Sequence, residues 1–233
     1  MERPSLHYGE SYGREDPFLS RRLVQSARLL DPYLKKGYRI LDIGGYAGDL
    51  KGYLPEEIDY WVVDFDRDAL GIAEKKGARV KQVNLDEEDL PFGKEEFDII
   101  LCLEVLEHLK DPRRHLEKMR GVVKKDGVVL ISLPNENTLY HRLRSLLGFG
   151  PDSFAFRSFK HLHLPTINQS RFLVSEFFEI KKEVYHINIG FHAMRLEFLG
   201  KLLVRIPDGF WQFLANTWPG LFARGVIFLG TPR

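Results

Sequence analysis

Residues 39–48 read Arg-Ile-Leu-Asp-Ile-Gly-Gly-Tyr-Ala-Gly, and this stretch decides the fold. A short apolar run reaches Asp42 and leads at once into a turn that contains Gly44, Gly45 and Gly48. Glycine allows a tight turn after a buried strand and lets the backbone come close to a ligand. The stretch therefore predicts a buried parallel strand followed by a ligand-binding loop.

Strand and helix patterns alternate along the rest of the chain. Apolar runs predict strands at 38–43, 60–63, 78–83, 97–102, 128–133, 177–187 and 225–230. Helical spacing predicts helices over 17–35, 47–53, 67–76, 112–123, 137–147 and 166–174, with further helical material between 191 and 218. The predicted fold class is α/β, with a Rossmann-like, seven-stranded, mostly parallel sheet and helices on both faces. An N-terminal helical arm and a C-terminal helical elaboration complete it.

The composition indicates a globular protein of a reducing compartment. The chain has 233 residues and a single cysteine, Cys102, which has no partner for an intrachain disulfide. The first residues lack the apolar core of a signal peptide, and no stretch of 18 apolar residues occurs. We therefore expect a cytoplasmic protein.

Charge and aromatic residues are unevenly distributed. Residues 134–233 hold 12 Lys+Arg against 7 Asp+Glu, which leaves 22 against 26 for residues 1–133. The second part also holds 13 of the 17 phenylalanines. The imbalance has two explanations: either it is incidental and the phenylalanines form part of the core, or the second part of the chain contacts an anionic or hydrophobic substrate.

Polar residues follow the ends of the predicted strands. Asp64 ends the second strand, where a carboxylate in nucleoside-binding sheets accepts hydrogen bonds from ribose hydroxyls. Residues 84–92 follow the third strand and offer side-chain oxygens for an adenine amino group. Residues 104–108, Glu-Val-Leu-Glu-His, follow the fourth strand. Together these residues predict a nucleoside site at one edge of the sheet.

These motifs resemble those of class I S-adenosylmethionine-dependent methyltransferases. The resemblance is to the small-molecule branch related to quinone-biosynthesis methyltransferases. It covers 39–135, a little under half of the chain, through six motifs in family order: 41–48, 63–70, 90–92, 97–100, 104–108 and 128–135. The chain departs from the family in two places, with Tyr46 where glycine is usual and Asn84 where aspartate is common.

The resemblance implies a role for each matching residue. Cofactor contacts are implied for Asp42, Gly44, Gly45, Tyr46, Gly48, Asp64, Phe65, Asn84, Leu85, Asp86 and Glu104, with adenine meeting either Asn84 or Asp86. We predict acceptor contacts for Tyr8, Tyr12, Glu107, His108, His161 and His163, and no metal ion. His108 is the candidate catalytic base if the acceptor must lose a proton, because histidine titrates near neutral pH.

The resemblance also divides the chain. We expect one methyltransferase domain over 1–233, with an arm and helix at 1–36, a cofactor-binding core at 37–135, and a substrate-side elaboration with the last strands at 136–233. The cofactor would be S-adenosyl-L-methionine, with S-adenosyl-L-homocysteine as product. The arm and the elaboration would close over the acceptor.

Several partners and activities stay open on the sequence alone. The acceptor would be a small molecule, a lipid or a glycan; nucleic acid is not expected, because no basic stripe is present. Peripheral membrane contact through the Phe-rich segment 191–222 is a further hypothesis. The alternatives to a methyltransferase are a related binding protein without turnover, with Tyr46 blocking the site, and an NAD-dependent oxidoreductase.

Overall fold

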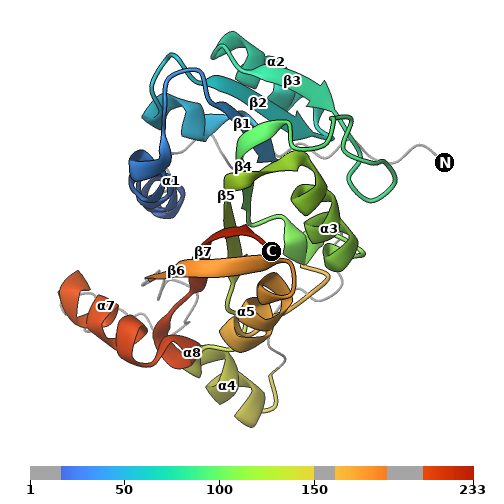
Figure 1. Ribbon diagram of the computed structural model, residues 1–233. Helices are drawn as coiled ribbons and strands as arrows, with labels where there is room; N and C mark the ends of the chain where they lie inside the picture. Colours follow the sequence, from blue (N-terminus) through green and yellow to red (C-terminus); the bar gives the residue numbers. More distant parts are fainter. Residues whose placement is uncertain (1–16, 150–160, 188–206) are drawn as a thin grey trace.

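A seven-stranded sheet forms the centre of the protein in the computed structural model, which describes residues 17–149, 161–187 and 207–233 (Figure 1). The strand order is β3-β2-β1-β4-β5-β7-β6. The strands are β1 (Arg39–Ile43), β2 (Asp59–Asp64), β3 (Arg79–Gln82), β4 (Phe97–Leu103), β5 (Val123–Pro134), β6 (Phe178–His186) and β7 (Gly225–Pro232).

Most strand pairs of this sheet are parallel. Strands β1 to β5 pair in parallel, whereas β7 is antiparallel to both β5 and β6. The predicted seven-stranded, mostly parallel sheet is therefore confirmed. Gly225 pairs with Pro134 on one side and with His186 on the other, so the ends of β5 and β6 lie at the same edge. This carboxyl edge is where open α/β sheets bind ligands.

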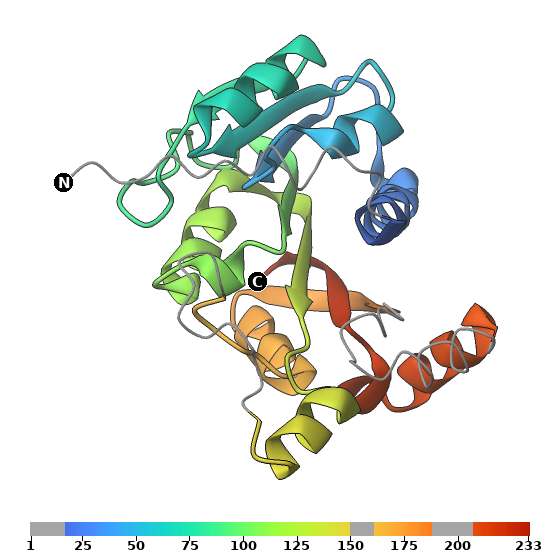
Figure 2. The same ribbon diagram turned by 180° about the vertical axis from the view of Figure 1, so that it is seen from behind.

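Helices cover both faces of the sheet, as predicted. They are α1 (Pro17–Leu30), α2 (Arg67–Lys75), α3 (Pro112–Val122), α4 (Leu139–Leu146), α5 (Ile167–Ser175), α7 (Asp208–Thr217) and α8 (Pro219–Phe222), with 3₁₀ helices η2 (Asp31–Tyr33), η3 (Asp49–Tyr53) and η4 (Leu106–His108). Helices α1 and α3 lie on opposite sides of β4 and β5 in both views (Figures 1 and 2).

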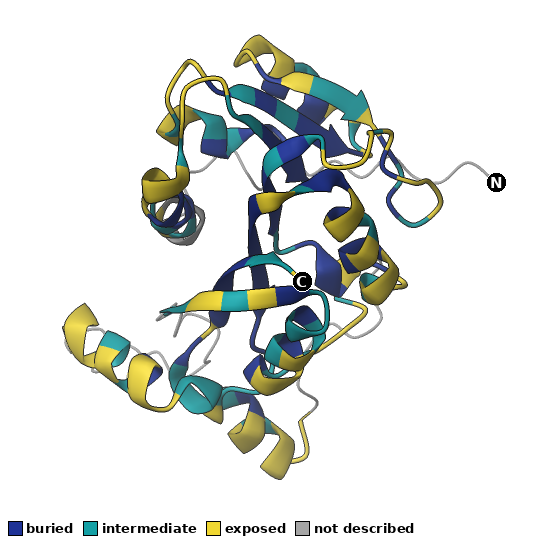
Figure 3. Ribbon diagram, viewed as in Figure 1, coloured by how far each residue is buried: buried dark blue, intermediate teal, exposed yellow. Residues whose placement is uncertain are grey.

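The core consists of two apolar layers, one on each face of the sheet. Alternate strand residues point to opposite faces, so Ile99 packs with α1 and α2, whereas Ile100 packs with α3 and α5. The central strands β4 and β5 are buried along most of their length, while the outer turns of the helices are exposed (Figure 3). Cys102 is fully buried in β4, as expected for a strand residue.

Two predicted helices differ from those observed. The helix expected over 17–35 ends at Leu30 and the 3₁₀ helix η2 begins at Asp31, because Pro32 lacks the backbone N–H that a continuing α-helix would use. The helix expected over 47–53 is the 3₁₀ helix η3, which begins after the left-handed Gly48. Both differences shorten the helices and leave the strands in place.

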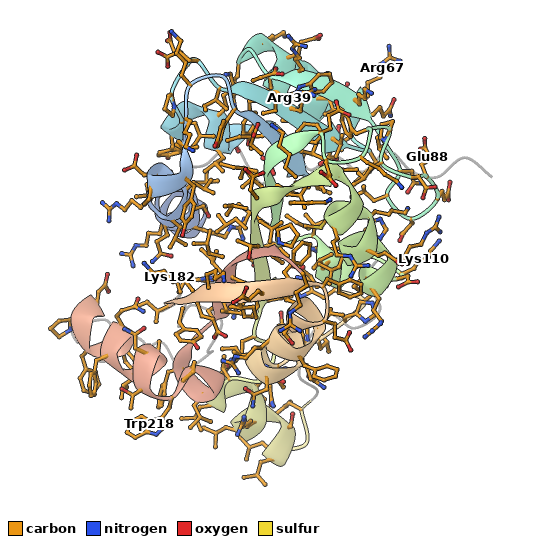
Figure 4. All side chains as sticks on the ribbon, in the orientation of Figure 1. Arg39, Arg67, Glu88, Lys110, Lys182 and Trp218 are labelled. Atoms are coloured by element: carbon orange, nitrogen blue, oxygen red, sulfur yellow. The ribbon has the colours of Figure 1, made fainter. Side chains whose placement is uncertain are left out.

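The C-terminal part carries exposed apolar side chains on its helices. Leu143 and Leu146 on α4 are exposed, as are Phe213 on α7 and Trp218 at its C-terminal end (Figure 4). Part of the helical material expected between 191 and 218 lies outside the described residues. Within the described ranges, no helix is long and apolar enough to cross a membrane.

Candidate active site

The glycine-rich turn after β1 takes a backbone conformation that only glycine adopts freely. Gly44 and Gly48 have φ values of 66° and 65°, in the left-handed region. A Cβ at Gly45 would lie 2.5 Å from Cγ of Asp42, and one at Gly44 would lie 2.5 Å from Cγ2 of Val105. The turn therefore passes directly over the end of β1, as the sequence predicts.

Tyr46 adopts the same left-handed conformation without being glycine. Its φ is 48°, which costs a residue with a Cβ roughly 1–2 kcal/mol. Its backbone N–H donates a 3.0 Å hydrogen bond to Oδ2 of Asp64, and the side chain is half-buried. The residue that departs from the family pattern thus holds the loop of β1 against the end of β2.

Asp42 lies buried beneath this turn. The Tyr60 hydroxyl donates a 2.5 Å hydrogen bond to Oδ2 of Asp42. Burial raises the pKa of Asp42 to about 7, with the nearby Asp64 adding to the effect and the Tyr60 hydrogen bond opposing it. A cationic group of a ligand would stabilise this carboxyl group in its ionised form, since an opposite charge nearby favours that form.

Asp64 joins the first two strand ends. Its Oδ2 accepts from Tyr46 and its Oδ1 accepts a 3.0 Å hydrogen bond from the N–H of Asp66. Burial raises its pKa, although the backbone hydrogen bonds oppose this. Asp66 caps α2 by accepting hydrogen bonds from two backbone N–H groups. Phe65, between them, is 52% exposed.

The residues predicted to meet adenine form a turn after β3. Oδ1 of Asn84 accepts a hydrogen bond from the N–H of Asp86, at 3.2 Å. Oδ1 of Asp86 in turn accepts from the N–H of Lys110, at 2.8 Å, while Leu85 is buried. Asn84 and Asp86 therefore each have a structural hydrogen bond, and the choice between them as the adenine contact stays open.

Glu104 at the end of β4 contacts helix α1, which lies far from it in the sequence. It has a φ of 57°, and its Oε1 accepts a 2.8 Å hydrogen bond from the Ser132 hydroxyl on β5. Its Oε2 lies 3.7 Å from Nη1 of Arg22 on α1. The helix that precedes the core in the sequence thus reaches the carboxyl edge of the sheet.

Three residues predicted to contact the acceptor lie together beyond β4. One donor atom each from Glu107, His108 and His161 lies within 4.8 Å of the other two. Glu107 Oε1 is 3.8 Å from His108 Nε2 and 3.9 Å from His161 Nε2, and neither of its carboxyl oxygens has a hydrogen-bond partner among the described residues. A carboxylate and two imidazoles are suitable ligands for a transition-metal ion, a site that the sequence does not predict.

Burial controls the protonation of this cluster. It raises the pKa of Glu107 well above its usual value, and the charge of Glu104 adds to this. The pKa of His108 falls to about 4, first through desolvation of the ring and then through His161, although 39% of its side chain is exposed. His108 is therefore a neutral imidazole at neutral pH that can accept a proton, but its pKa lies below the near-neutral value expected from the sequence, which makes it a weaker base than an ordinary histidine.

Other groups near the cluster were not found from the sequence. Glu136 Oε1 lies 2.9 Å from Nδ1 of His161, and its Oε2 lies 3.5 Å from Nε2 of His141. Burial alone would raise the pKa of Glu136, but the hydrogen bond from His161 and the charges of His161, Arg224 and His141 together outweigh burial and lower it. His163 lies apart, with Nε2 2.9 Å from the Leu109 carbonyl oxygen. Tyr8 and Tyr12 lie outside the described residues.

A family model described as a methyltransferase domain matches residues 15–173, more than half of the chain. The chain belongs to the class I S-adenosylmethionine-dependent methyltransferases. This confirms the family that the motifs resemble, and the matched range contains the carboxyl ends of β1 to β5.

Curated relatives of this methyltransferase match over a limited stretch. The chain is 33% identical over 108 residues to a ubiquinone biosynthesis O-methyltransferase of Cereibacter sphaeroides. The matched stretch covers 44% of this chain and 43% of that protein. It is 32% identical over 108 residues to the enzyme of the same name from Coxiella burnetii, covering 44% and 46%. The chain thus matches less than half the length of these relatives.

Solved structures match the methyltransferase over nearly its whole length. A methyltransferase of Thermotoga maritima, named as a possible histamine N-methyltransferase, has a TM-score of 0.65 at 16% identity and covers 97% of each chain. A methyltransferase of Archaeoglobus fulgidus has a TM-score of 0.60 at 20% identity, with 93% and 97% covered. At these identities the likeness shows the fold.

Proposed function

We propose that this methyltransferase binds S-adenosylmethionine at the carboxyl edge of β1, β2 and β4 and transfers its methyl group to a small-molecule acceptor. One arrangement carries the proposal: the glycine turn over Asp42, joined through the Tyr46 N–H to Asp64 at the next strand end. The two named O-methyltransferase relatives support a small-molecule acceptor. Lipid and glycan acceptors remain the weaker alternatives.

The residues at this edge fit the cofactor in two respects. The left-handed glycines leave the backbone uncovered by side chains, so a ligand can approach it closely. Asp42 is a buried carboxyl group whose pKa of about 7 would fall beside an ammonium group. We assign the methionine end to Asp42, Gly44 and Glu104, and the ribose to Asp64, as expected from the sequence.

Bound S-adenosylmethionine supplies a methyl group on a sulfonium, which becomes a neutral thioether when the methyl group leaves. The chain's own residues hold the acceptor in line with that methyl group and exclude water. A hydroxyl or amine acceptor must also lose a proton when its new bond to carbon forms. His108 is the group we propose to receive it, since its imidazole is neutral and partly exposed.

The function is tested by binding and turnover with the purified protein. Calorimetry should show binding of S-adenosylhomocysteine but not of NAD. Methyl transfer from labelled S-adenosylmethionine should then be detected on members of a panel of catechols, phenols and amines. If S-adenosylhomocysteine does not bind, the proposal is wrong.

A binding protein without turnover is the second candidate function. Tyr46 favours it, because a half-buried ring stands where the family usually has glycine. In that case no acceptor would be methylated. S-adenosylhomocysteine would either bind to the unaltered protein or bind only after Tyr46→Gly opens the site. Turnover by the unaltered protein excludes this candidate.

A further inference from the structure

A cavity of about 410 Å³ lies between α1, the end of β6 and the start of α7. Its lining includes Arg22, Gln25 and Arg28 from α1, His186 from β6 and Gln212 from α7. The volume lies within the range of about 300–1,000 Å³ typical of sites for small molecules. Because His186 pairs in register with Gly225 opposite Pro134, the cavity lies at the carboxyl edge of the sheet.

The cavity is rich in arginine. Among the described residues of the lining, three are arginines and one, Asp208, is acidic. Asp208 already forms an ion pair, since its Oδ2 lies 2.9 Å from Nη2 of Arg21. Arg28 forms no ion pair with any residue that the structure describes. Arg22 lies near Glu104 at the end of β4, so Arg28 is the lining arginine whose charge no described acidic residue offsets, and this charge suits an anionic ligand.

Arg22 links this cavity to the proposed methyl-transfer site. It lines the cavity, and Nη1 lies 3.7 Å from Oε2 of Glu104 at the end of β4. Glu104 is the residue we assign to the methionine end of the cofactor. A molecule in the cavity would thus lie next to the end of the cofactor that carries the methyl group. His108 is not among the described residues that line the cavity, so an acceptor held there must extend past Glu104 to reach the proposed base.

The lining also offers an uncharged polar group for orientation. Oε1 of Gln25 is buried and has no hydrogen-bond partner among the described residues. Because this oxygen is shielded from the cavity as well as from solvent, a ligand would reach it only after the Gln25 side chain turns. The amide adds a polar group to the lining and does not by itself indicate a ligand.

We infer that this cavity binds the methyl acceptor and that the acceptor carries an anionic group, a carboxylate or a phosphate, held by Arg22 and Arg28. The inference rests on the proposed function and narrows its acceptor class. Arginine suits this role, because its planar guanidinium forms paired hydrogen bonds with either anion. The net positive charge of residues 134–233 acts in the same direction at longer range.

The test compares matched neutral and anionic probes on the protein saturated with S-adenosylhomocysteine. Benzoate is compared with benzamide, and phenyl phosphate with phenol, by calorimetry. Both anions should bind about tenfold or more tightly than their neutral partners, as expected for charge-assisted hydrogen bonds. Preference for benzoate over phenyl phosphate, or the reverse, identifies the anion.

Two substitutions locate the effect. Arg28→Gln should lower benzoate affinity about tenfold and leave benzamide binding unchanged. Lys125→Gln removes the same charge on an 86% exposed side chain near the start of β5, away from the carboxyl edge, and should change neither. Equal binding of benzoate and benzamide overturns the inference.

The cofactor readout separates this inference from the proposed function. If Arg28→Gln or Arg22→Gln weakens S-adenosylhomocysteine binding and leaves benzoate binding unchanged, the arginine belongs to the cofactor site and the inference is wrong. If S-adenosylhomocysteine does not bind to the unaltered protein at all, the proposed function fails first. If S-adenosylhomocysteine binds normally but benzoate and benzamide bind equally well, the inference of an anionic acceptor is wrong and the proposed function still stands.

Discussion

The hydroxyl group of Tyr60 on β2 donates a 2.5 Å hydrogen bond to Oδ2 of Asp42 on β1, and both side chains are buried. The donor is uncharged, so it offsets little of the cost of burying a carboxylate. Burial raises the pKa of Asp42 to about 7 and that of Tyr60 well above 10. The pair is therefore a buried polar contact whose charge changes near neutral pH.

Replacing Tyr60 by Phe should leave the Asp42 carboxyl group without this donor. We expect the free energy of unfolding to fall by about 1–3 kcal/mol, the usual cost of a buried group that loses its partner. Chemical denaturation measures it. Tyr53→Phe is the matched control, because Tyr53 is 46% exposed and removal of its hydroxyl group should have little effect.

The stability of the protein should depend on pH through Asp42. Its pKa is about 7 in the folded state against 3.8 when unfolded, so the folded state holds the extra proton between these values. The contribution of Asp42 to the free energy of unfolding is therefore complete below about pH 4. It is lost as the pH rises to about 7, and the free energy of unfolding falls by at most about 1.4 kcal/mol per pH unit. Other buried groups also titrate, so the measurement is the difference between the unaltered protein and Asp42→Asn. A difference that does not vary over this range would contradict the assignment.

Gly45→Ala should disrupt the glycine-rich turn after β1. Its Cβ would lie 2.5 Å from Cγ of Asp42, so either the loop or the carboxyl group must move. We expect S-adenosylhomocysteine affinity to fall at least tenfold and stability to fall by about 1–3 kcal/mol, as for overpacked sites. Gly52→Ala is the control, because nothing lies within 4 Å of the Cβ it would add.

Two substitutions at Tyr46 separate backbone strain from the effect of the ring. Both Tyr46→Gly and Tyr46→Ala remove the ring, but only glycine is unstrained at a φ of 48°. The glycine variant should therefore be more stable than the alanine variant by about 1–2 kcal/mol in thermal unfolding. If both variants bind S-adenosylhomocysteine equally and more tightly than the unaltered protein, the ring narrows the site.

His108→Gln tests the proposed base. Glutamine keeps a polar side chain of similar size but does not accept a proton at neutral pH. We expect kcat to fall by about 10²–10⁴ while S-adenosylhomocysteine affinity changes less than twofold. The same assay with and without EDTA checks whether the cluster of Glu107, His108 and His161 uses a metal ion. Unchanged kcat in the variant would exclude His108 as the base.

The strands and strand-end acids could be predicted because they depend on local patterns. Apolar runs followed by glycine or acidic residues place Asp42, Asp64 and Glu104, and the sheet brings them to one edge. The contact between Arg22 and Glu104 could not be predicted in this way. It depends on how α1 packs against a strand that lies about 80 residues further along the chain.

The burial of Glu107 also lacked a sequence signal. A glutamate next to histidine after a strand is equally typical of a solvent-facing helix residue, so the local sequence does not distinguish a buried Glu107 from an exposed one. The 3₁₀ turn η4 directs Glu107 inward, and segment 161–163 covers it, since the N–H groups of Leu162 and His163 both donate to its carbonyl oxygen. A short turn and a distant segment together determine the burial, so a local pattern does not show it.

The position of β7 between β5 and β6 has a consequence for synthesis on the ribosome. β7 follows the other six strands in the chain, and β6 joins the sheet through β7 alone among the described strands. The ends of β1, β2 and β4 can therefore assemble while the last strand is still in the exit tunnel. The wall of the arginine-lined cavity that β6 supplies cannot form so early, so a nascent chain can gain the proposed cofactor edge before it gains the proposed acceptor cavity.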